Sequence, residues 1–214
     1  MTPTRSTEYL AGLVRELCKL SNETEWAEFK VNKADPQEIG EYLSALANAA
    51  ALAGKPFAYL AWGVENATHA IVGTQFAPAS AKVGNEELES WLLQLLTPKV
   101  QFRFFEVEVD GRHVALLEVE RAYRQPVQFE GLEYIRVGSY KKKLKDFPEK
   151  ERALWRIFDR VPFEGGRARE HATEDEVLQL LDYPSYFDLL GMPLPEGRQG
   201  ILTALSSDGL IPSN

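Results

Sequence analysis

The fold is decided by residues 23–73, which contain ETEWAEFK at 23–30, DPQEIGEYLSALANAAALA at 35–53, FAYLAWGV at 57–64 and IVG at 71–73. Asp35 followed by Pro36 is typical of a helix start, with the aspartate as N-cap and the proline in the first turn. Apolar residues then recur at helical spacing, and many of them are alanines, which allow another element to pack very close. The next segment, 57–64, is almost continuously apolar, as in a strand buried on both faces. The stretch therefore predicts a helix followed by a central strand, with acidic residues at both ends of the unit.

The composition is that of an ordinary globular protein. The chain has 214 residues, of which 44% are hydrophobic and 26% charged, enough for one full domain and a small second one. No apolar run approaches the roughly 20 residues of a membrane-spanning helix, and the N-terminus lacks a signal-peptide pattern. The single cysteine, Cys18, cannot form an internal disulfide. These features predict a cytoplasmic protein that does not enter a membrane.

Charge is unevenly distributed along the chain. The formal net charge is −8, which argues against a protein that is basic throughout. Residues 121–160 nevertheless hold 11 Lys and Arg against 6 Asp and Glu. A local excess of this kind attracts a polyanion to one face of a protein. The alternative is a solvated basic surface without a partner.

The remaining sequence as far as about residue 160 alternates helical and strand patterns. A helix is predicted over 85–96, capped by Asn85, and another over 147–158, started by a capping box of Asp146 and Glu149. Hairpin turns are predicted at Asp110-Gly111 and at Glu130-Gly131, and the second hairpin ends at residue 137. Together these elements predict an α+β fold, in which helices pack on a mixed, partly antiparallel sheet.

Glycines at 165 and 166 indicate a linker over 163–172, which separates a domain over 1–162 from a helical segment over 173–214. Thr173 is the expected cap of the first helix of this segment, and a second helical pattern covers 196–205. Helix, turn and helix are the front half of a winged-helix unit. We therefore expect a small, partial winged-helix-like segment and a chain that is a fragment of a longer protein.

An acidic cluster opens the first domain. Glu23 and Glu28 are five residues apart, and Lys30 follows. Carboxylates grouped in this way are ligands for Mg²⁺ or Mn²⁺, and a lysine beside them can neutralise a phosphate oxygen. By itself the pattern is weak, because scattered glutamates on a solvated loop explain it as well.

A second acidic position follows the central strand. Glu65 and Asn66 come directly after the apolar segment 57–64, and functional groups often gather where strands of a sheet end. The alternative is the polar tip of a hairpin. Packing of the apolar helix and strand between the two acidic positions could bring them together into one metal site.

Basic and aromatic residues follow the second hairpin. Arg136 lies in its last strand, and Tyr140 precedes Lys141, Lys142 and Lys143. Lysine and arginine meet nucleic-acid phosphates, and a tyrosine among them can stack on a base. A solvated turn would also account for this composition.

Taken in order, these landmarks resemble the Schlafen AlbA-like domain. The resemblance covers about residues 8–160 and is carried by these residues: Glu23, Glu28-Phe29-Lys30, Ser44-Ala45-Leu46-Ala47-Asn48, Gly63-Val64-Glu65-Asn66, Ile71-Val72-Gly73 and Tyr134-Ile135-Arg136-Val137-Gly138-Ser139. It implies a nucleic-acid-binding domain. In the ribonuclease branch of the family it implies three acidic residues that bind a divalent metal and cleave tRNA or rRNA. Glu23 and Glu28 match the first two, and the third falls on Glu65 or on Asn66, which has no carboxylate.

Three hypotheses follow. The leading one is a nucleic-acid-binding domain, RNA favoured over DNA, that contacts phosphates through Arg136 and residues 141–143. In its catalytic form this domain is an endoribonuclease with Glu23, Glu28, Glu65 and Lys30 in the active site and Mg²⁺ or Mn²⁺ as cofactor. The second hypothesis is a non-catalytic, DNA-binding transcriptional regulator. The third is a protein–protein module whose acidic face meets a basic partner, and homo-oligomerisation is compatible with each.

Overall fold

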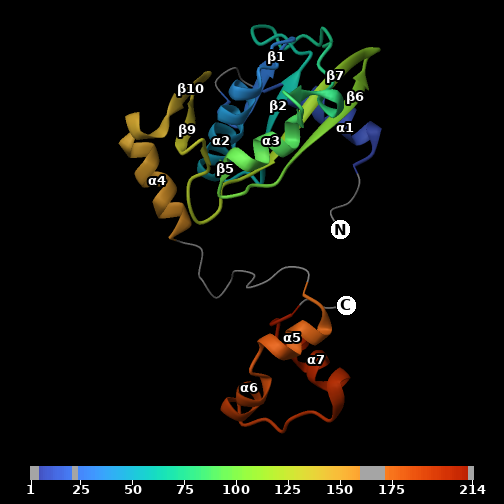
Figure 1. Cartoon of the computed structure of the whole chain (residues 1–214), viewed down its shortest axis with the longest axis vertical. Coiled ribbons are helices and arrows are strands. Elements are labelled where there is room, and N and C mark those ends of the chain that lie inside the picture. Colours follow the sequence, from blue (N-terminus) through green and yellow to red (C-terminus); the bar gives the residue numbers. More distant parts are fainter. Residues whose placement is uncertain (1–4, 21–23, 160–171, 212–214) are drawn as a thin grey trace. The chain divides into compact units, whose positions relative to one another are not determined.

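The computed structural model of the chain describes residues 5–20, 24–159 and 172–211 (Figure 1). The chain divides into two compact units, unit 1 (Met1–Pro162) and unit 2 (Phe163–Asn214). The helices of unit 1 are α1 (Thr7–Leu17), α2 (Pro36–Leu52), α3 (Leu88–Leu95) and α4 (Pro148–Phe158), with 3₁₀ turns η1 (Pro78–Ser80) and η2 (Leu144–Asp146). Its strands are β1 (Ala27–Lys30), β2 (Phe57–Trp62), β3 (Lys82–Val83), β4 (Glu86–Glu87), β5 (Leu96–Thr97), β6 (Phe102–Val109), β7 (Arg112–Glu120), β8 (Gln128–Phe129), β9 (Leu132–Val137) and β10 (Tyr140–Lys143).

The central sheet has the strand order β1-β2-β7-β6. Strands β1 and β2 are parallel, whereas β7 runs antiparallel to both of its neighbours, β2 and β6. The β6–β7 hairpin turns at Asp110 and Gly111, both with positive φ, as the Asp-Gly pair predicts. This mixed sheet with packed helices confirms the predicted α+β fold.

Both faces of the central sheet are covered. One face packs against α2 in a core that contains Leu43, Leu46 and Trp62, and the other packs against α1 through Val14 and Phe29. Because side chains alternate along a strand, neighbouring residues of β1 enter different layers. Phe29 of β1 therefore faces α1, and Glu28 faces α2.

The second sheet has the order β10-β9-β8-β5 and lies along α2 (Figure 1). Ser44 and Asn48 of α2 hold it through backbone groups of β9 and of the segment before β8. Asn48 accepts a hydrogen bond from the Val127 amide (2.8 Å) and donates to the carbonyls of Val127 (3.0 Å) and Tyr134 (2.9 Å). Ser44 donates to the Val127 carbonyl (2.7 Å) and accepts from the Tyr134 amide (2.9 Å). Both polar side chains are fully buried, so they replace the strand partner that these backbone groups lack.

Two helix starts differ from the prediction. The helix expected from Asn85 begins at Leu88, because residues 82–87 form the small β3–β4 hairpin. The capping box expected from Asp146 and Glu149 is absent from α4, whose N-cap is Phe147 without a side-chain hydrogen bond. Asp146 is instead the last residue of η2, the 3₁₀ turn that connects β10 to α4. The Asp35 cap of α2 is confirmed, since its carboxylate accepts from the Glu38 amide at 2.9 Å.

Gly40 permits the close packing of α2 against Phe129. A Cβ atom built at this position would lie 2.1 Å from a ring carbon of Phe129. We expect Gly40→Ala to lower the free energy of unfolding by about 1–3 kcal/mol through overpacking, although alanine is the better helix former. The matched control is Gly12→Ala in α1, where a Cβ meets no atom within 4 Å. That change is expected to stabilise by about 0.4–1 kcal/mol. Equal effects in urea denaturation of the two variants would refute this account.

The described part of unit 2 consists of three helices, α5 (Glu174–Leu180), α6 (Tyr183–Leu189) and α7 (Gly197–Ser207). Thr173 caps α5 in a capping box with Glu176, as its position predicts. Phe187, Ile201 and Leu205 form the buried core of the unit.

None of the helices in the described ranges is long and apolar enough to cross a membrane.

Candidate nucleic-acid interface

Glu28 and Arg136 form a buried ion pair between β1 and β9. Glu28 and Lys30 project from the face of β1 that is opposite to Phe29, toward α2. The Oε2 atom of Glu28 lies 2.5 Å from Nη2 of Arg136, and the two residues are 3% and 1% exposed. Among the described residues, Nε and Nη1 of Arg136 have no hydrogen-bond partner. Glu28 is therefore the one anion that this buried guanidinium contacts in the described structure.

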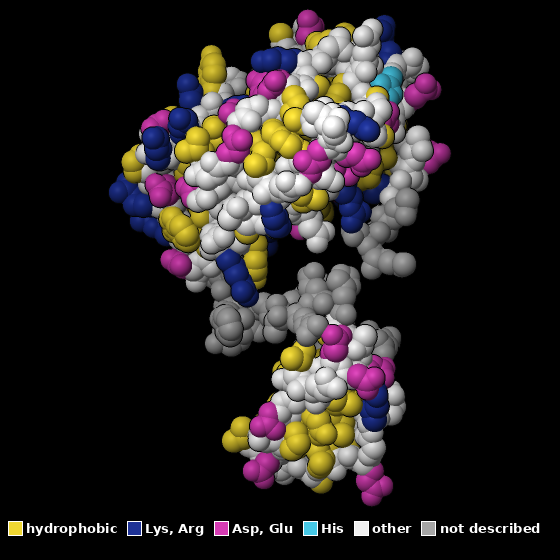
Figure 2. Space-filling view, in the orientation of Figure 1, with side chains coloured by type: hydrophobic (Ala, Val, Ile, Leu, Met, Phe, Trp, Pro, Cys, Tyr) yellow, Lys and Arg dark blue, Asp and Glu magenta, His cyan; other side chains and the backbone are white. Residues whose placement is uncertain are grey.

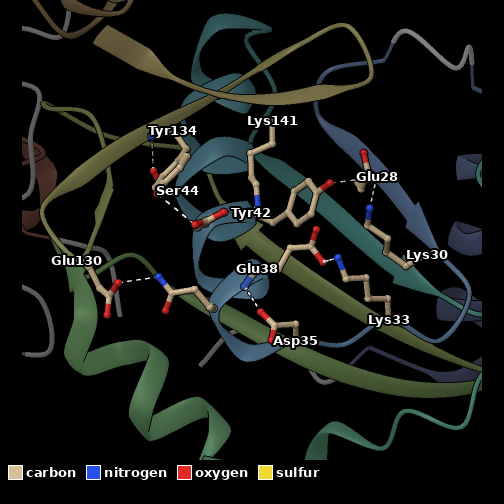
Figure 3. Close-up of polar contacts among 12 residues, drawn as sticks. Glu28, Lys30, Lys33, Asp35, Glu38, Tyr42, Ser44, Glu130, Tyr134 and Lys141 are labelled. Atoms are coloured by element: carbon tan, nitrogen blue, oxygen red, sulfur yellow. Dashed lines mark hydrogen bonds and ion pairs between the residues drawn. The ribbon is translucent and has the colours of Figure 1, made fainter. Parts of the chain in front are cut away.

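Tyr42 of α2 lies at the centre of the same cluster (Figure 3). Its hydroxyl donates to Oε1 of Glu28 at 3.3 Å, and Nζ of Lys30 lies 3.1 Å from the same oxygen. Three cations approach the Tyr42 ring: Nζ of Lys141 at 4.4 Å, Nζ of Lys30 at 5.0 Å and Cζ of Arg136 at 5.7 Å from the centroid. The aromatic ring thus lies among cations that would otherwise repel one another.

These contacts shift the pKa values of the titratable groups. Burial lowers the pKa of Lys30, but attraction to Glu28 and the contact with Tyr42 outweigh it, so the net shift is upward. Burial and the nearby Glu28 raise the pKa of Tyr42. Lys30 is therefore charged and Tyr42 neutral at neutral pH, and each keeps the form that binds the Glu28 carboxylate.

Two further ion pairs attach the β9–β10 hairpin and α4 to the same side of unit 1. Nζ of Lys141 lies 2.5 Å from Oε2 of Glu41, and the other oxygen of Glu41 accepts from the Tyr134 hydroxyl at 3.2 Å. Burial and Glu41 raise the pKa of Tyr134 to about 12. Glu25 accepts from the Gly138 amide (2.9 Å) and from Nζ of Lys150 (2.7 Å). The acidic stretch 25–28 thus meets the basic segment 136–150 in space, although each of its two carboxylates lies against cations.

The proposed metal ligands occupy different environments. Glu23 lies outside the described residues. Glu65 and Asn66 are exposed in the turn after β2, and the Glu65 carboxylate accepts from the Thr68 hydroxyl at 2.5 Å. His69 of that turn packs on Phe29, and their ring centroids are 4.4 Å apart. Phe29 projects from the face of β1 opposite to that of Glu28, so the turn lies on the other side of the strand. Within the described ranges, no group of three or more His, Cys, Asp or Glu side chains is arranged to hold a metal ion.

The predicted nucleic-acid contacts divide into interior and surface residues. Arg136 was expected at the surface but lies in the interior, where it is paired with Glu28. Lys141 is mostly buried and paired with Glu41. Tyr140, Lys142 and Lys143 are exposed on β10, and Nζ of Lys142 lies 5.5 Å from the Tyr140 ring centroid. Strand alternation explains the division between Lys141 and Lys142, because neighbouring side chains leave β10 on opposite faces.

Sequence reasoning missed Glu41 and Tyr42 as members of this cluster. Both lie in α2, where they interrupt an otherwise apolar and alanine-rich stripe. Tyr42 is buried and the Glu41 side chain is only 24% exposed, and polar groups so placed need partners, so these two residues were a usable signal. The partners themselves come from β1, β9 and β10 and could not be named from helical spacing.

Comparison with known proteins places these elements in a family. No curated protein matches the chain in sequence. Among solved structures, it is similar to the DIP2311 protein from Corynebacterium diphtheriae, at 16% identity and a TM-score of 0.44, covering 85% of this chain and 34% of that one. It is also similar to the N-terminal domain of a RecG-related protein from Nitrosomonas europaea, at 20% identity and a TM-score of 0.35, covering 56% of this chain and 75% of that one. The chain spans about a third of the length of the first of these proteins.

The family model described as "Schlafen, AlbA_2" matches residues 23–145, which is more than half of the chain. The matched segment runs from the acidic stretch before β1 to η2 and includes the whole cluster around Tyr42. The chain therefore belongs to the Schlafen, AlbA_2 family, and this membership suggests a nucleic-acid-binding domain.

Proposed function

We propose that unit 1 binds nucleic acid through the exposed side chains of β10, with Lys142 and Lys143 on phosphates and Tyr140 stacked on a base. The observation that carries the proposal is the exposure of Tyr140, 67%, beside a lysine. Within the described structure, Lys142, Lys143 and Lys145 form no ion pair, so these charges are available to a polyanion. Figure 2 shows Lys and Arg side chains gathered over the side of unit 1 that β10 and α4 form.

The buried cluster supports this surface from beneath. Glu28, Glu41 and Tyr42 contact Arg136 and Lys141, the two cations that β9 and β10 direct inward. Ser44 and Asn48 fix the backbone of β9 from the same helix. Nucleic-acid binding needs the outward side chains held in place, and these contacts join the hairpin to α2 and β1.

The divalent-metal site of the ribonuclease hypothesis does not fit the described residues. Both oxygens of Glu28 are engaged by Arg136, Lys30 and Tyr42, and Glu65 lies in a turn that packs on the other face of β1. Hard divalent cations need several oxygen ligands around one point, without cations among them. We therefore derive no cleavage step from these residues. RNA stays the proposed target because the family resemblance includes ribonucleases, and a DNA-binding regulator is the alternative.

The double substitution Lys142→Gln/Lys143→Gln is expected to lower the affinity for nucleic acid and to make that affinity less dependent on salt. Each lost phosphate contact lowers the slope of log K against log[salt] by about 0.7 for a single strand, so the double variant should lose about 1.4. Affinity at low salt should fall roughly tenfold and uniformly across sequences. The measurement is fluorescence anisotropy with labelled tRNA, single-stranded RNA and duplex DNA at several salt concentrations. The order of the three affinities tests the preference for RNA.

The charge-matched control is Lys19→Gln/Lys82→Gln. Both lysines are exposed, the first paired with Glu16 after α1 and the second on β3. This variant should keep the wild-type slope. If both double variants lose affinity equally, the interface is not on β10. If wild-type protein binds none of the three nucleic acids, the proposed function is wrong.

The same mixtures with Mn²⁺ test the ribonuclease hypothesis. Because Glu28 has a buried ion-pair role, the informative variant is Glu65→Gln, which changes an exposed carboxylate. We expect intact RNA on gels for both wild type and variant. Mn²⁺-dependent cleavage that Glu65→Gln removes would support catalysis by this chain.

A further inference from the structure

The outward face of α4 carries a second aromatic residue among cations. Leu154 and Phe158 are four residues apart and buried, and they hold α4 on the core of unit 1. On the other side, Arg152, Trp155 and Arg156 are exposed. Their i, i+3 and i+4 spacing places them on one face of the helix. None of these three residues takes part in the contacts proposed for β10.

Trp155 is held in place but remains open to solvent. Its ring lies 5.8 Å from that of Phe158, nearly perpendicular at 87°. The residue is nevertheless 42% exposed, whereas Trp62 of the same unit is fully buried. A large, partly fixed aromatic side chain at the surface provides a flat stacking area at little cost in side-chain entropy.

The two arginines beside Trp155 suit a polyanion as the ligand of this face. In the described structure, neither Arg152 nor Arg156 forms an ion pair. Exposed acidic residues, Glu149 and Asp159, lie at the two ends of α4, so the cations beside the ring are the two arginines. The exposed lysines of β10 and Lys145 of η2 precede this helix in the chain. Tryptophan and arginine are also enriched at protein–protein interfaces. Surfaces that bind single strands, however, combine phosphate-binding cations with exposed aromatic residues, and unit 1 already presents this combination on β10.

The geometry points to an unpaired nucleotide as the ligand of this face. We propose that Trp155 stacks on a base of a single-stranded segment while Arg152 and Arg156 bind the flanking phosphates. The bases of a duplex are stacked on one another and offer no free face to an indole. The inference rests on the proposed function and adds a second stacking residue, on α4, which commits the target to nucleic acid with single-stranded segments.

The test compares Trp155→Ala with Trp155→Phe in the full chain. Probes are a labelled 15-nucleotide oligo-U, a blunt-ended duplex RNA and a blunt-ended duplex DNA. Base–aromatic stacking contributes roughly 1–3 kcal/mol per base, so Trp155→Ala should weaken oligo-U binding by about 5- to 150-fold. Duplex binding should change less than about threefold, and the salt slope for oligo-U should stay at the wild-type value because no charge is lost.

Trp155→Phe provides the matched control. Phenylalanine retains a stacking ring, so oligo-U affinity should stay within about threefold of wild type. Oligo-U should quench tryptophan emission in wild type, and this quenching should largely disappear in Trp155→Phe. The result that overturns the inference is wild-type oligo-U binding that Trp155→Ala leaves unchanged, or an equal loss for duplex and single strand.

Two other outcomes separate the alternatives. If Trp155→Ala changes the sedimentation coefficient and not the affinity for oligo-U, this face is a protein interface and the inference is wrong. If wild type binds duplex through Lys142 and Lys143 but does not bind oligo-U, the inference fails, and of the proposed function the phosphate contacts hold while the stacking of Tyr140 fails. Far-UV circular dichroism of each variant verifies that α4 remains folded.

Discussion

Replacing Glu28 with alanine is expected to lower the free energy of unfolding of unit 1 by about 3–5 kcal/mol. The change removes one partner of a buried ion pair and leaves the Arg136 guanidinium without an anion in the interior. It also removes the acceptor of the Tyr42 hydroxyl and a contact of Lys30. All four tryptophans lie in unit 1, so tryptophan fluorescence in a urea titration reports this unit by itself.

Two variants control this prediction. Glu16→Ala removes an exposed glutamate whose pair with Lys19 lies at the surface, and it should cost less than about 1 kcal/mol. Glu28→Leu/Arg136→Met replaces both buried charges by apolar side chains and should recover most of the lost stability. If Glu28→Ala is as mild as Glu16→Ala, Arg136 has another anion and the described pairing is incomplete.

The Glu28 result also bears on function. A Glu28 variant that unfolds loses every activity of unit 1, so a loss of RNA cleavage in it would not identify a metal ligand. A Glu28 variant that is fully stable but inactive would argue for a catalytic carboxylate instead. Measuring stability and nucleic-acid binding on the same preparation separates these outcomes.

Asn48→Ala should have the second largest effect, a loss of about 2–5 kcal/mol in the free energy of unfolding. The amide side chain makes three hydrogen bonds to backbone groups of Val127 and Tyr134, and all of them are buried. Ser44 still donates to the Val127 carbonyl, but the Val127 amide and the Tyr134 carbonyl lose the partner that Asn48 provides. Each buried group without a partner costs about 1–3 kcal/mol.

The control for Asn48 is Asn85→Ala, an exposed asparagine in the turn between β3 and β4. It should change the free energy of unfolding by less than about 0.5 kcal/mol. Since Asn48 fixes β9, the strand that pairs with β10, its loss should also weaken nucleic-acid binding under conditions where the variant is still folded. An Asn48→Ala variant with wild-type stability would show that these backbone groups find water or another donor.

Local chemistry made much of the fold predictable. The Asp35-Pro36 cap, the apolar stripe of α2 and the continuous apolar run of β2 each depend on residues close together in the chain. The turns at Asp110-Gly111 and Glu130-Gly131 were predicted for the same reason. The two wrong helix starts lie where the same residues form another local structure. Asp146 belongs to η2 and does not cap α4, and residues 82–87 form a short hairpin before α3.

The candidate site was predictable only as a set of residue types. The sequence marked acidic residues near 23–28 and basic residues near 136–143, and the acidic group was expected to meet Glu65 or Asn66 in a metal site. It could not show that Glu28 and Arg136 neutralise each other in the interior while Lys142 remains exposed. Burial and pairing depend on which strand faces which helix, and that is decided by contacts between residues more than a hundred positions apart.

By itself, the sequence determined the α+β class, the places of α2, β2, the β6–β7 hairpin and α4, and the concentration of positive charge after residue 120. These features follow from periodicity, capping and composition, which act over a few residues at a time. Only the tertiary structure decided which charges meet solvent, because side chains alternate along β1 and β10 and the packing of α2 selects the inward ones. The outward cations of β10 and α4, with Tyr140 and Trp155 among them, are what this packing leaves available for a ligand.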